Sequence, residues 1–207
     1  MLGLPKSTEI NQQLPKKAIF QKFELKPAQR DHFDADISKL TLVNAISQNK
    51  LPALQKGETI ETIYVVDVAL KRPNYDPKNI QMLSKLIPQK MLFALHYEDE
   101  IQLAIYHTKL ICGSWVPADA YELELTGTTT DLVWENLVKA IGGIEVEEGN
   151  TLEEQIVIDE DREKLRCQIE SMEAKSRIEK QPRRKLEMFE QLQEMKRQYG
   201  ESKTDKQ

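Results

Sequence analysis

The side chains best suited to chemistry are three carboxylates in segments where apolar and polar residues alternate. Asp67 lies between apolar neighbours in residues 60–71, and Glu122 and Glu124 share one face of residues 120–127. Carboxylates that converge on a sheet can hold the metal ions that cleave phosphodiesters, usually with a lysine nearby to stabilise the developing charge. The residue types therefore give one hypothesis, a divergent metal-dependent nuclease that uses Asp67 with Glu122 or Glu124.

Ordinary structural roles explain the same three residues. Alternation along an edge strand places Glu122 and Glu124 on a solvated face without any catalytic role. Asp67 lies on a strand that is apolar on both faces, where a carboxylate is costly unless it is paired, and a structural partner would satisfy it. In addition, no strand carries the acid-x-Lys pattern that nuclease sheets usually show.

Other catalytic signatures are absent from the sequence. It contains no GxxxxGK[ST], GxGxxG, HExxH or GxSxG, and Cys112 and Cys167 form no CxxC pair. The three histidines are scattered along the chain. We therefore expect no cofactor and no metal site, and the sequence leans against an enzyme.

Two basic segments give another hypothesis, direct DNA binding. The first 30 residues carry a net positive charge with phenylalanines between the lysines, a pattern that can follow a phosphate backbone. The alternative is that the phenylalanines pack on the sheet while the lysines face solvent. The candidate nucleic-acid residues are Lys16, Lys17, Lys22 and Lys26, with Arg183, Arg184 and Lys185 near the other end of the chain.

The hydrophobic pattern predicts an α+β fold. We expect a mixed, mostly antiparallel sheet with one βαβ crossover and flanking helices, plus a C-terminal helical hairpin or coiled coil. The expected strands are residues 37–47, 60–71, 90–98, 101–111 and 120–127. The expected helices of this part are residues 9–14, 16–23, 76–87 and 131–141.

Residues 151–207 are highly charged and contain two apolar stripes that differ in heptad frame. Since an unbroken coiled coil would keep its frame, we expect two helices, residues 152–179 and 183–199, folded as a hairpin or kinked at Pro182. Their narrow stripe needs a partner, which is the other helix, the α+β domain or another chain. The expected partner-binding residues are Leu165, Ile169, Met172, Leu186, Phe189, Leu192 and Met195, with Trp115 of the "GSWV" loop as a possible interface anchor.

Composition divides the 207 residues into four parts. These are an N-terminal helical segment that packs on the sheet (1–36), the α+β core (37–148), the charged helices (149–200) and a disordered tail (201–207). The net charge of −5 gives no overall attraction to nucleic acid, and no apolar run is long enough to span a membrane. The N-terminus fits neither a secretory nor a mitochondrial signal. Two cysteines without a CxxC pair predict no disulfide framework, so we expect a protein of the reducing cytoplasm.

Several segments together resemble a bacterial family catalogued only as a domain of unknown function. They are "GLPKSTEINQQLPKK", "ETIYVVDVAL", "IPQKMLFAL", "GSWV" and "TTTDLVWENLVKAI". The resemblance implies that the genes of this family lie beside helicase and DNA-methyltransferase genes, in clusters that resemble restriction or phage-defence systems. The resemblance implies helicase-like or methyltransferase-like protein partners, with DNA as a further candidate, and supplies no catalytic motif. We therefore expect a non-enzymatic adaptor that works by protein–protein docking.

Overall fold

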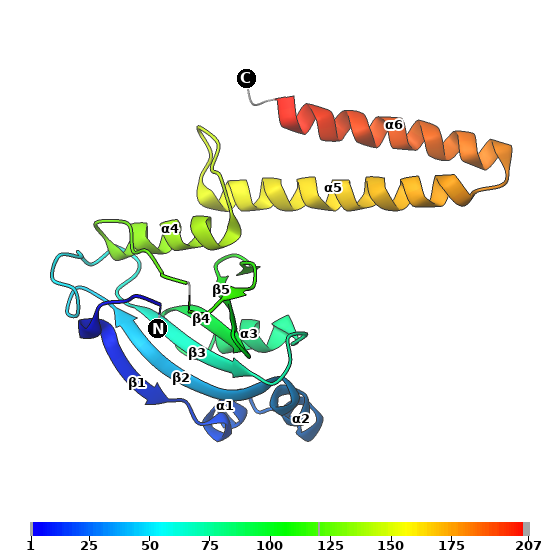
Figure 1. The fold of residues 1–207 in the computed structure, drawn as a ribbon. Coiled ribbons are helices and arrows are strands. Elements are labelled where there is room, and N and C mark those ends of the chain that lie inside the picture. The colour runs from blue at the N-terminus through cyan, green and yellow to red at the C-terminus, as the bar shows by residue number, and fades with distance from the viewer. Residues whose placement is uncertain (1, 120, 205–207) are drawn as a thin grey trace. The chain divides into compact units, whose positions relative to one another are not determined.

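The computed structural model describes residues 2–119 and 121–204 (Figure 1). The chain divides into two compact units, residues 1–144 and 145–207, and each is described by itself. The first unit contains a seven-stranded sheet with the order β1-β2-β3-β4-β5-β6, and β7 also pairs with β5. The strands are β1 (Glu9–Gln13), β2 (Ile37–Ile46), β3 (Ile63–Leu70), β4 (Lys90–Tyr97), β5 (Glu100–Tyr106), β6 (Leu110–Cys112) and β7 (Val116–Pro117).

The sheet is mixed, and only the central pair β3–β4 is parallel. The helix α3 (Pro77–Leu83) forms the crossover between these two strands. It begins at Pro77, since the preceding residue Asp76 caps the helix by accepting a hydrogen bond on its side chain from the backbone N–H of Lys78 at 2.9 Å. The predicted βαβ unit and the mostly antiparallel sheet are thus confirmed.

Helices cover both faces of the sheet. One face packs against α1 (Lys16–Lys22), α2 (Pro27–Asp36) and α3, and its core includes Ile19, Phe33, Ile80, Val68 and Phe93. The short helix η1 (Lys6–Thr8) precedes β1, and its Thr8 hydroxyl accepts a hydrogen bond from Asn44 of β2 at 2.8 Å. The other face is covered by α4 (Thr130–Gly142), whose buried residues include Trp134 and Val138. Figure 1 shows α4 on the opposite side of the strands from α1 and α2. This two-sided coverage explains why β3 and β4 are apolar on both faces.

The N-terminus of α4 holds the loop that precedes β3. The carboxylate of Asp131 accepts hydrogen bonds from the backbone N–H groups of Glu58 (2.8 Å), Thr59 (3.2 Å) and Ile60 (2.8 Å), and from the Thr59 hydroxyl (3.0 Å). Partial burial acts to raise the pKa of Asp131, but the hydrogen bonds from Thr59, Ile60 and Glu58 together lower it below its ordinary value. The strand β3 begins at Ile63, later than the predicted strand, because its partners begin there: Ile63 pairs with Ile46 at the end of β2 and with Lys90 at the start of β4.

The second unit consists of two long helices that pack on each other, α5 (Leu152–Ile178) and α6 (Pro182–Thr204). A capping box starts α5, since Thr151 accepts from the backbone N–H of Glu154 while the Glu154 carboxylate accepts from that of Thr151. Pro182 is the first residue of α6, where its missing N–H has no cost. The chain therefore forms the predicted hairpin.

Three sequence predictions are corrected by the structure. Residues 9–13 form the strand β1 instead of a helix, because they pair with β2 and this pairing outweighs local propensity. Residues 101–111 form two strands, since a tight turn, in which the N–H of His107 donates to Lys109 O at 3.0 Å, reverses the chain between β5 and β6.

Residues 121–127 form no strand at all, although they alternate. The edge of β5 that they would need is occupied by β6 and β7, and the backbone of Leu123 bonds to Leu2 instead. The N-terminal segment 1–36 thus contains a strand as well as helices. In the expected tail, α6 continues through residue 204, and residues 205–207 lie outside the described chain.

Candidate functional site

The structure pairs Asp67 with a histidine. Asp67 of β3 and His96 of β4 lie on adjacent parallel strands, and His96 Nε2 is 2.9 Å from Asp67 Oδ1. About a third of each side chain is exposed. This contact supplies the structural partner that a carboxylate on an otherwise apolar strand requires.

The other two carboxylates of the nuclease hypothesis do not form a metal site with Asp67. Glu122 and Glu124 are exposed in the irregular segment that follows residue 120. Within residues 2–119 and 121–204, no group of three or more His, Cys, Asp or Glu side chains is arranged to hold a metal ion. Nothing in this geometry supports phosphodiester cleavage.

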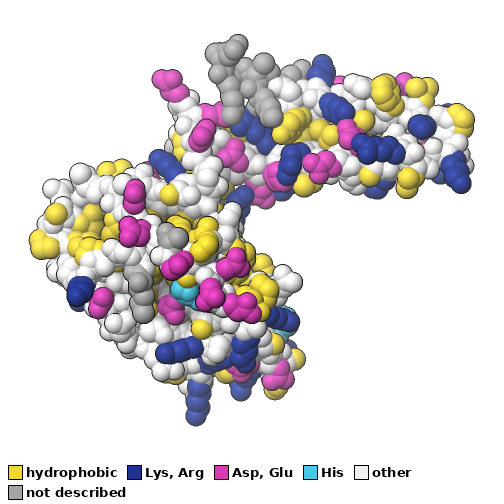
Figure 2. Space-filling view, viewed as in Figure 1, with side chains coloured by type: hydrophobic (Ala, Val, Ile, Leu, Met, Phe, Trp, Pro, Cys, Tyr) yellow, Lys and Arg dark blue, Asp and Glu magenta, His cyan; other side chains and the backbone are white. Residues whose placement is uncertain are grey.

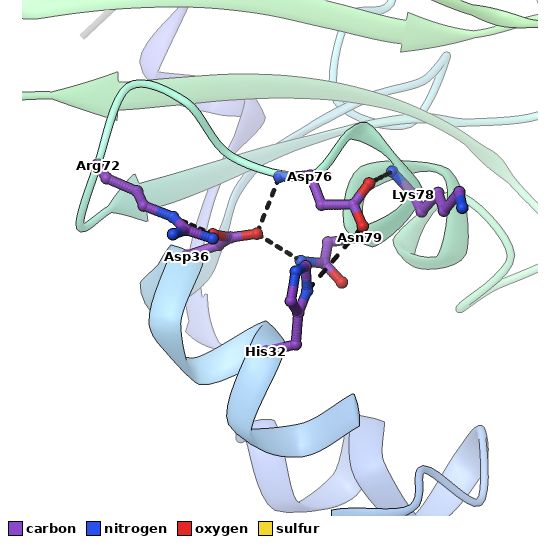
Figure 3. A network of polar contacts seen from close by, with 6 residues as sticks. All are labelled: His32, Asp36, Arg72, Asp76, Lys78 and Asn79. Atoms are coloured by element: carbon purple, nitrogen blue, oxygen red, sulfur yellow. Dashed lines mark hydrogen bonds and ion pairs between the residues drawn. The ribbon is translucent and has the colours of Figure 1, made fainter. Parts of the chain in front are cut away.

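The most extensive buried polar network centres on Asp36, at the C-terminal end of α2 (Figure 3). Asp36 is fully buried, and Arg72 donates from Nε to Asp36 Oδ1 at 2.5 Å, with a second contact from its Nη2 atom. Asp36 Oδ2 accepts from the backbone N–H of Asp76 at 2.9 Å and from Asn79 Nδ2 at 2.8 Å. His32 Nδ1 lies 4.0 Å from Asp76 Oδ2. The carboxylate therefore ties α2 to the loop after β3 and to α3.

A shallow groove of about 410 Å³ lies beside this network, between α2 and α3. Polar side chains of His32, Asp76 and Asn79 line it together with apolar residues such as Leu25 and Met82. The Asn79 side chain donates to Asp36, and the Asp76 side chain caps α3. The side chains of Asp76 and Asn79 thus have structural roles, and we assign the groove no ligand.

Cys112 is a candidate nucleophile by residue type only. The hydroxyl of Tyr75 is 3.7 Å from Cys112 Sγ and donates to Gln102 Oε1 at 2.8 Å. Although Cys112 is partly accessible, desolvation by the surrounding protein raises the pKa of its thiol, and the contact with Tyr75 only partly offsets this. A thiol with a raised pKa holds little of the reactive thiolate at neutral pH.

Two of the N-terminal lysines have roles within the fold. Lys16 Nζ contacts Asp34 Oδ1 at 2.6 Å and donates to Ile37 O at 2.5 Å, and Lys22 Nζ donates to Leu86 O. Lys17 and Lys26 are exposed. Phe20 packs edge-on against Phe33 of α2, with ring centroids 5.6 Å apart. The aromatic residues between these lysines therefore belong to the core.

Trp115 lies beside the core. It is half-buried and packs against the cluster that includes Phe93 and Leu95. This position is the one expected of a tryptophan that closes the end of a sheet, and it leaves only part of the ring accessible.

The apolar stripe of the C-terminal helices divides into two sets. Ile169 and Leu192 are 9% and 7% exposed, and Leu165, Met172 and Met195 are half-buried. Lys196 of α6 reaches Glu173 of α5 at 2.7 Å, which lowers the pKa of Glu173. These contacts hold the hairpin together.

The remaining stripe residues stay exposed on α6. Leu186 and Phe189 are 59% and 51% exposed, three residues apart on one side of the helix. Arg183, Arg184 and Lys185 precede them and are exposed, with 93% of the Arg183 side chain accessible. Arg184 lies on the opposite side of the helix from Leu186, since the two are two residues apart. We call the other four residues, Arg183, Lys185, Leu186 and Phe189, the α6 docking surface. Figure 2 shows hydrophobic and basic side chains together along the hairpin.

These observations define an α+β domain with a mixed sheet, joined to a charged helical hairpin. No helix in the described chain has the length and apolar character of a membrane span. The chain belongs to the DUF4391 family, a domain of unknown function, whose model matches residues 2–198. Neither the curated proteins nor the solved structures contain a significant match.

Sequence reasoning missed the Asp36 network. Asp36 lies in a polar stretch of α2, and its partners Arg72 and Asn79 are distant in sequence. The available signal was the turn cluster "RPNYDPKN", which supplies all three partners of the carboxylate.

Proposed function

We propose that this chain is a non-enzymatic adaptor subunit of a bacterial DNA-acting complex, of the restriction-like or phage-defence type, and that it works by protein–protein docking. Its partner would be a helicase-like or methyltransferase-like subunit. The proposal combines the membership of the DUF4391 family with the gene neighbourhood expected for that family. The α6 docking surface is the observation that carries it.

The docking surface suits a protein partner for a physical reason. Leu186 and Phe189 keep more than half of their surface in water although α5 and α6 pack on each other. Covering the exposed half of each side chain against a partner is favourable by about 1–1.5 kcal/mol, roughly half of the value for burying a fully exposed side chain. The adjacent Arg183 and Lys185 would select a partner whose rim is acidic.

Co-expression with a tagged helicase-like or methyltransferase-like neighbour tests the proposal. The double variant Leu186→Glu, Phe189→Glu should lose at least about tenfold in affinity for the tagged subunit, because it places two charges where apolar contact is needed. Gln191→Glu is the matched control, since Gln191 is an exposed residue of α6 about 200° around the helix from Phe189.

Two outcomes would overturn the proposal. Undiminished capture of the double variant would remove the α6 docking surface from the interface. Capture that survives deletion of residues 149–207 would remove the whole hairpin from the adaptor role. Far-UV circular dichroism of each full-length variant verifies that its helices are intact.

A further inference from the structure

A second surface of the hairpin lies on α5 and has no role in the proposed function. An apolar groove of about 430 Å³ runs along the hairpin. We call it the α5 groove, and it is lined by Cys167, Gln168, Ser171, Met172 and Lys175 of α5 and by Met195 of α6.

Two exposed apolar side chains flank the α5 groove at equal distances. Val157 lies ten residues before Cys167 and Ile178 lies ten residues after Gln168. They are 55% and 78% exposed. Ile178 follows Val157 by 21 positions, which is three heptads, so both fall on the same side of α5 in a left-handed pair of helices.

The two ends of the hairpin carry opposite charge. Residues 145–163 contain nine acidic residues and one basic residue, whereas residues 175–185 contain six basic residues and one acidic residue. A helix that fits along the groove must therefore place its basic end beside the acidic end of the hairpin and its acidic end beside the basic end. The hairpin of a second copy, with its α5 antiparallel to the first, has this distribution, and α5 itself contributes Lys175 and Arg177 at the basic end.

One twofold axis would bring both the apolar pair and the charged pair of residues opposite their counterparts in a second copy. The midpoint between Val157 and Ile178 falls between Cys167 and Gln168, in the groove. Glu160 and Lys175 lie seven residues before Cys167 and seven residues after Gln168, so they share the same midpoint. An interface between identical subunits requires this kind of self-complementary arrangement.

We propose that two copies of this chain associate through antiparallel pairing of their α5 helices, with the twofold axis at Cys167 and Gln168. Ile178 of each copy covers Val157 of the other, and Lys175 of each copy lies opposite Glu160 of the other. Within one chain Glu160 contacts Lys164 at 2.9 Å, an exposed pair that is easily exchanged. A nucleic acid carries one sign of charge, so the acidic end of the hairpin would repel it.

Sedimentation equilibrium of the full chain, in a Cys112→Ser background, measures this association. We expect twice the mass of one chain at high concentration. Lys175→Glu and Glu160→Lys should each weaken the dimer about tenfold, since each places like charges opposite each other at two symmetric contacts. Combining them should restore the dimer. Arg177→Glu is the control, because it makes the same change of charge on α5 at a residue that does not line the groove.

Crosslinking of Cys167 tests the position of the axis. A short bis-maleimide should join two chains through Cys167 and should fail with Cys167→Ser or Lys175→Glu at the same protein concentration. A chain that stays monomeric, or a dimer that responds equally to Lys175→Glu and Arg177→Glu, overturns the proposal. A dimer that is not crosslinked at Cys167 also overturns it, because its interface must lie elsewhere. The Leu186→Glu, Phe189→Glu variant should remain dimeric, which separates this result from the adaptor proposal.

Discussion

The carboxylate of Asp36 offers a test of how much one buried network contributes to the first unit. Replacing Asp36 with Ala removes the acceptor for the Asp76 N–H and the Asn79 amide, and Asn79 is only 9% exposed. Each buried donor left without a partner costs about 1–3 kcal/mol. The Arg72 side chain is 47% exposed and can be solvated again, so the loss of its ion pair with Asp36 adds little to the cost. We expect Asp36→Ala to lower the free energy of unfolding by about 3–4 kcal/mol.

Asp36→Asn should cost much less, for a reason visible in Figure 3. The amide can turn its oxygen towards Asp76 and Asn79 and its NH₂ towards Arg72, which then moves into solvent. This keeps the two buried bonds, loses the partly exposed ion pair and leaves the new NH₂ group to bond water in the space that Arg72 vacates, a loss of about 1–2 kcal/mol.

Urea unfolding followed by tryptophan fluorescence measures both values. Trp115 and Trp134, the two tryptophans of the chain, lie in residues 1–144, so the fluorescence reports on the first unit alone. The midpoint should shift while the slope with urea stays constant. Equal losses for Asp36→Ala and Asp36→Asn, or losses below about 0.5 kcal/mol for both, would refute the reasoning.

Two further predictions concern the α4 clamp and the hairpin. Asp131→Asn should lower stability by about 1–2 kcal/mol at neutral pH. Because the folded state lowers the pKa of Asp131, its stabilisation is present above the unfolded pKa of about 3.9 and is lost as the pH falls through the lowered folded pKa; urea midpoints of the two proteins should therefore converge in acid. Leu192→Ala should destabilise the hairpin by about 2 kcal/mol or more, seen in helical circular dichroism but not in tryptophan fluorescence. Leu186→Ala, at an exposed position, should change the stability of the hairpin by less than about 0.5 kcal/mol.

The parts of the fold that the sequence predicted are those in which local pattern and tertiary burial agree. The strands around Asp67 and His96 are continuous apolar runs, as a two-sided central sheet requires. The helix α4 has a Thr129 cap and ends at Gly143 in the left-handed conformation, φ 59°, which glycine adopts without strain.

The missed elements depend on contacts between distant residues. The polar segment of β1 has no strand pattern and is extended because it pairs with β2. The partners of Asp36 and the choice of which stripe residues remain exposed likewise follow from how helices pack. The sequence predicted a hairpin or a kink at Pro182, and only the structure shows that Ile169 and Leu192 become buried while Phe189 does not.

The two edges of the sheet bear on how the protein avoids aggregation. All five residues of β1 are exposed, and its pairing with β2 is interrupted between Glu9 and Gln12, where Asn11 has a positive φ of 56°. At the far side, the edge is divided between the very short strands β6 and β7. Irregular, polar or short edges are poor templates for adding another strand. Newly made chains should therefore resist growth into fibrils through this sheet, even where many copies are crowded together.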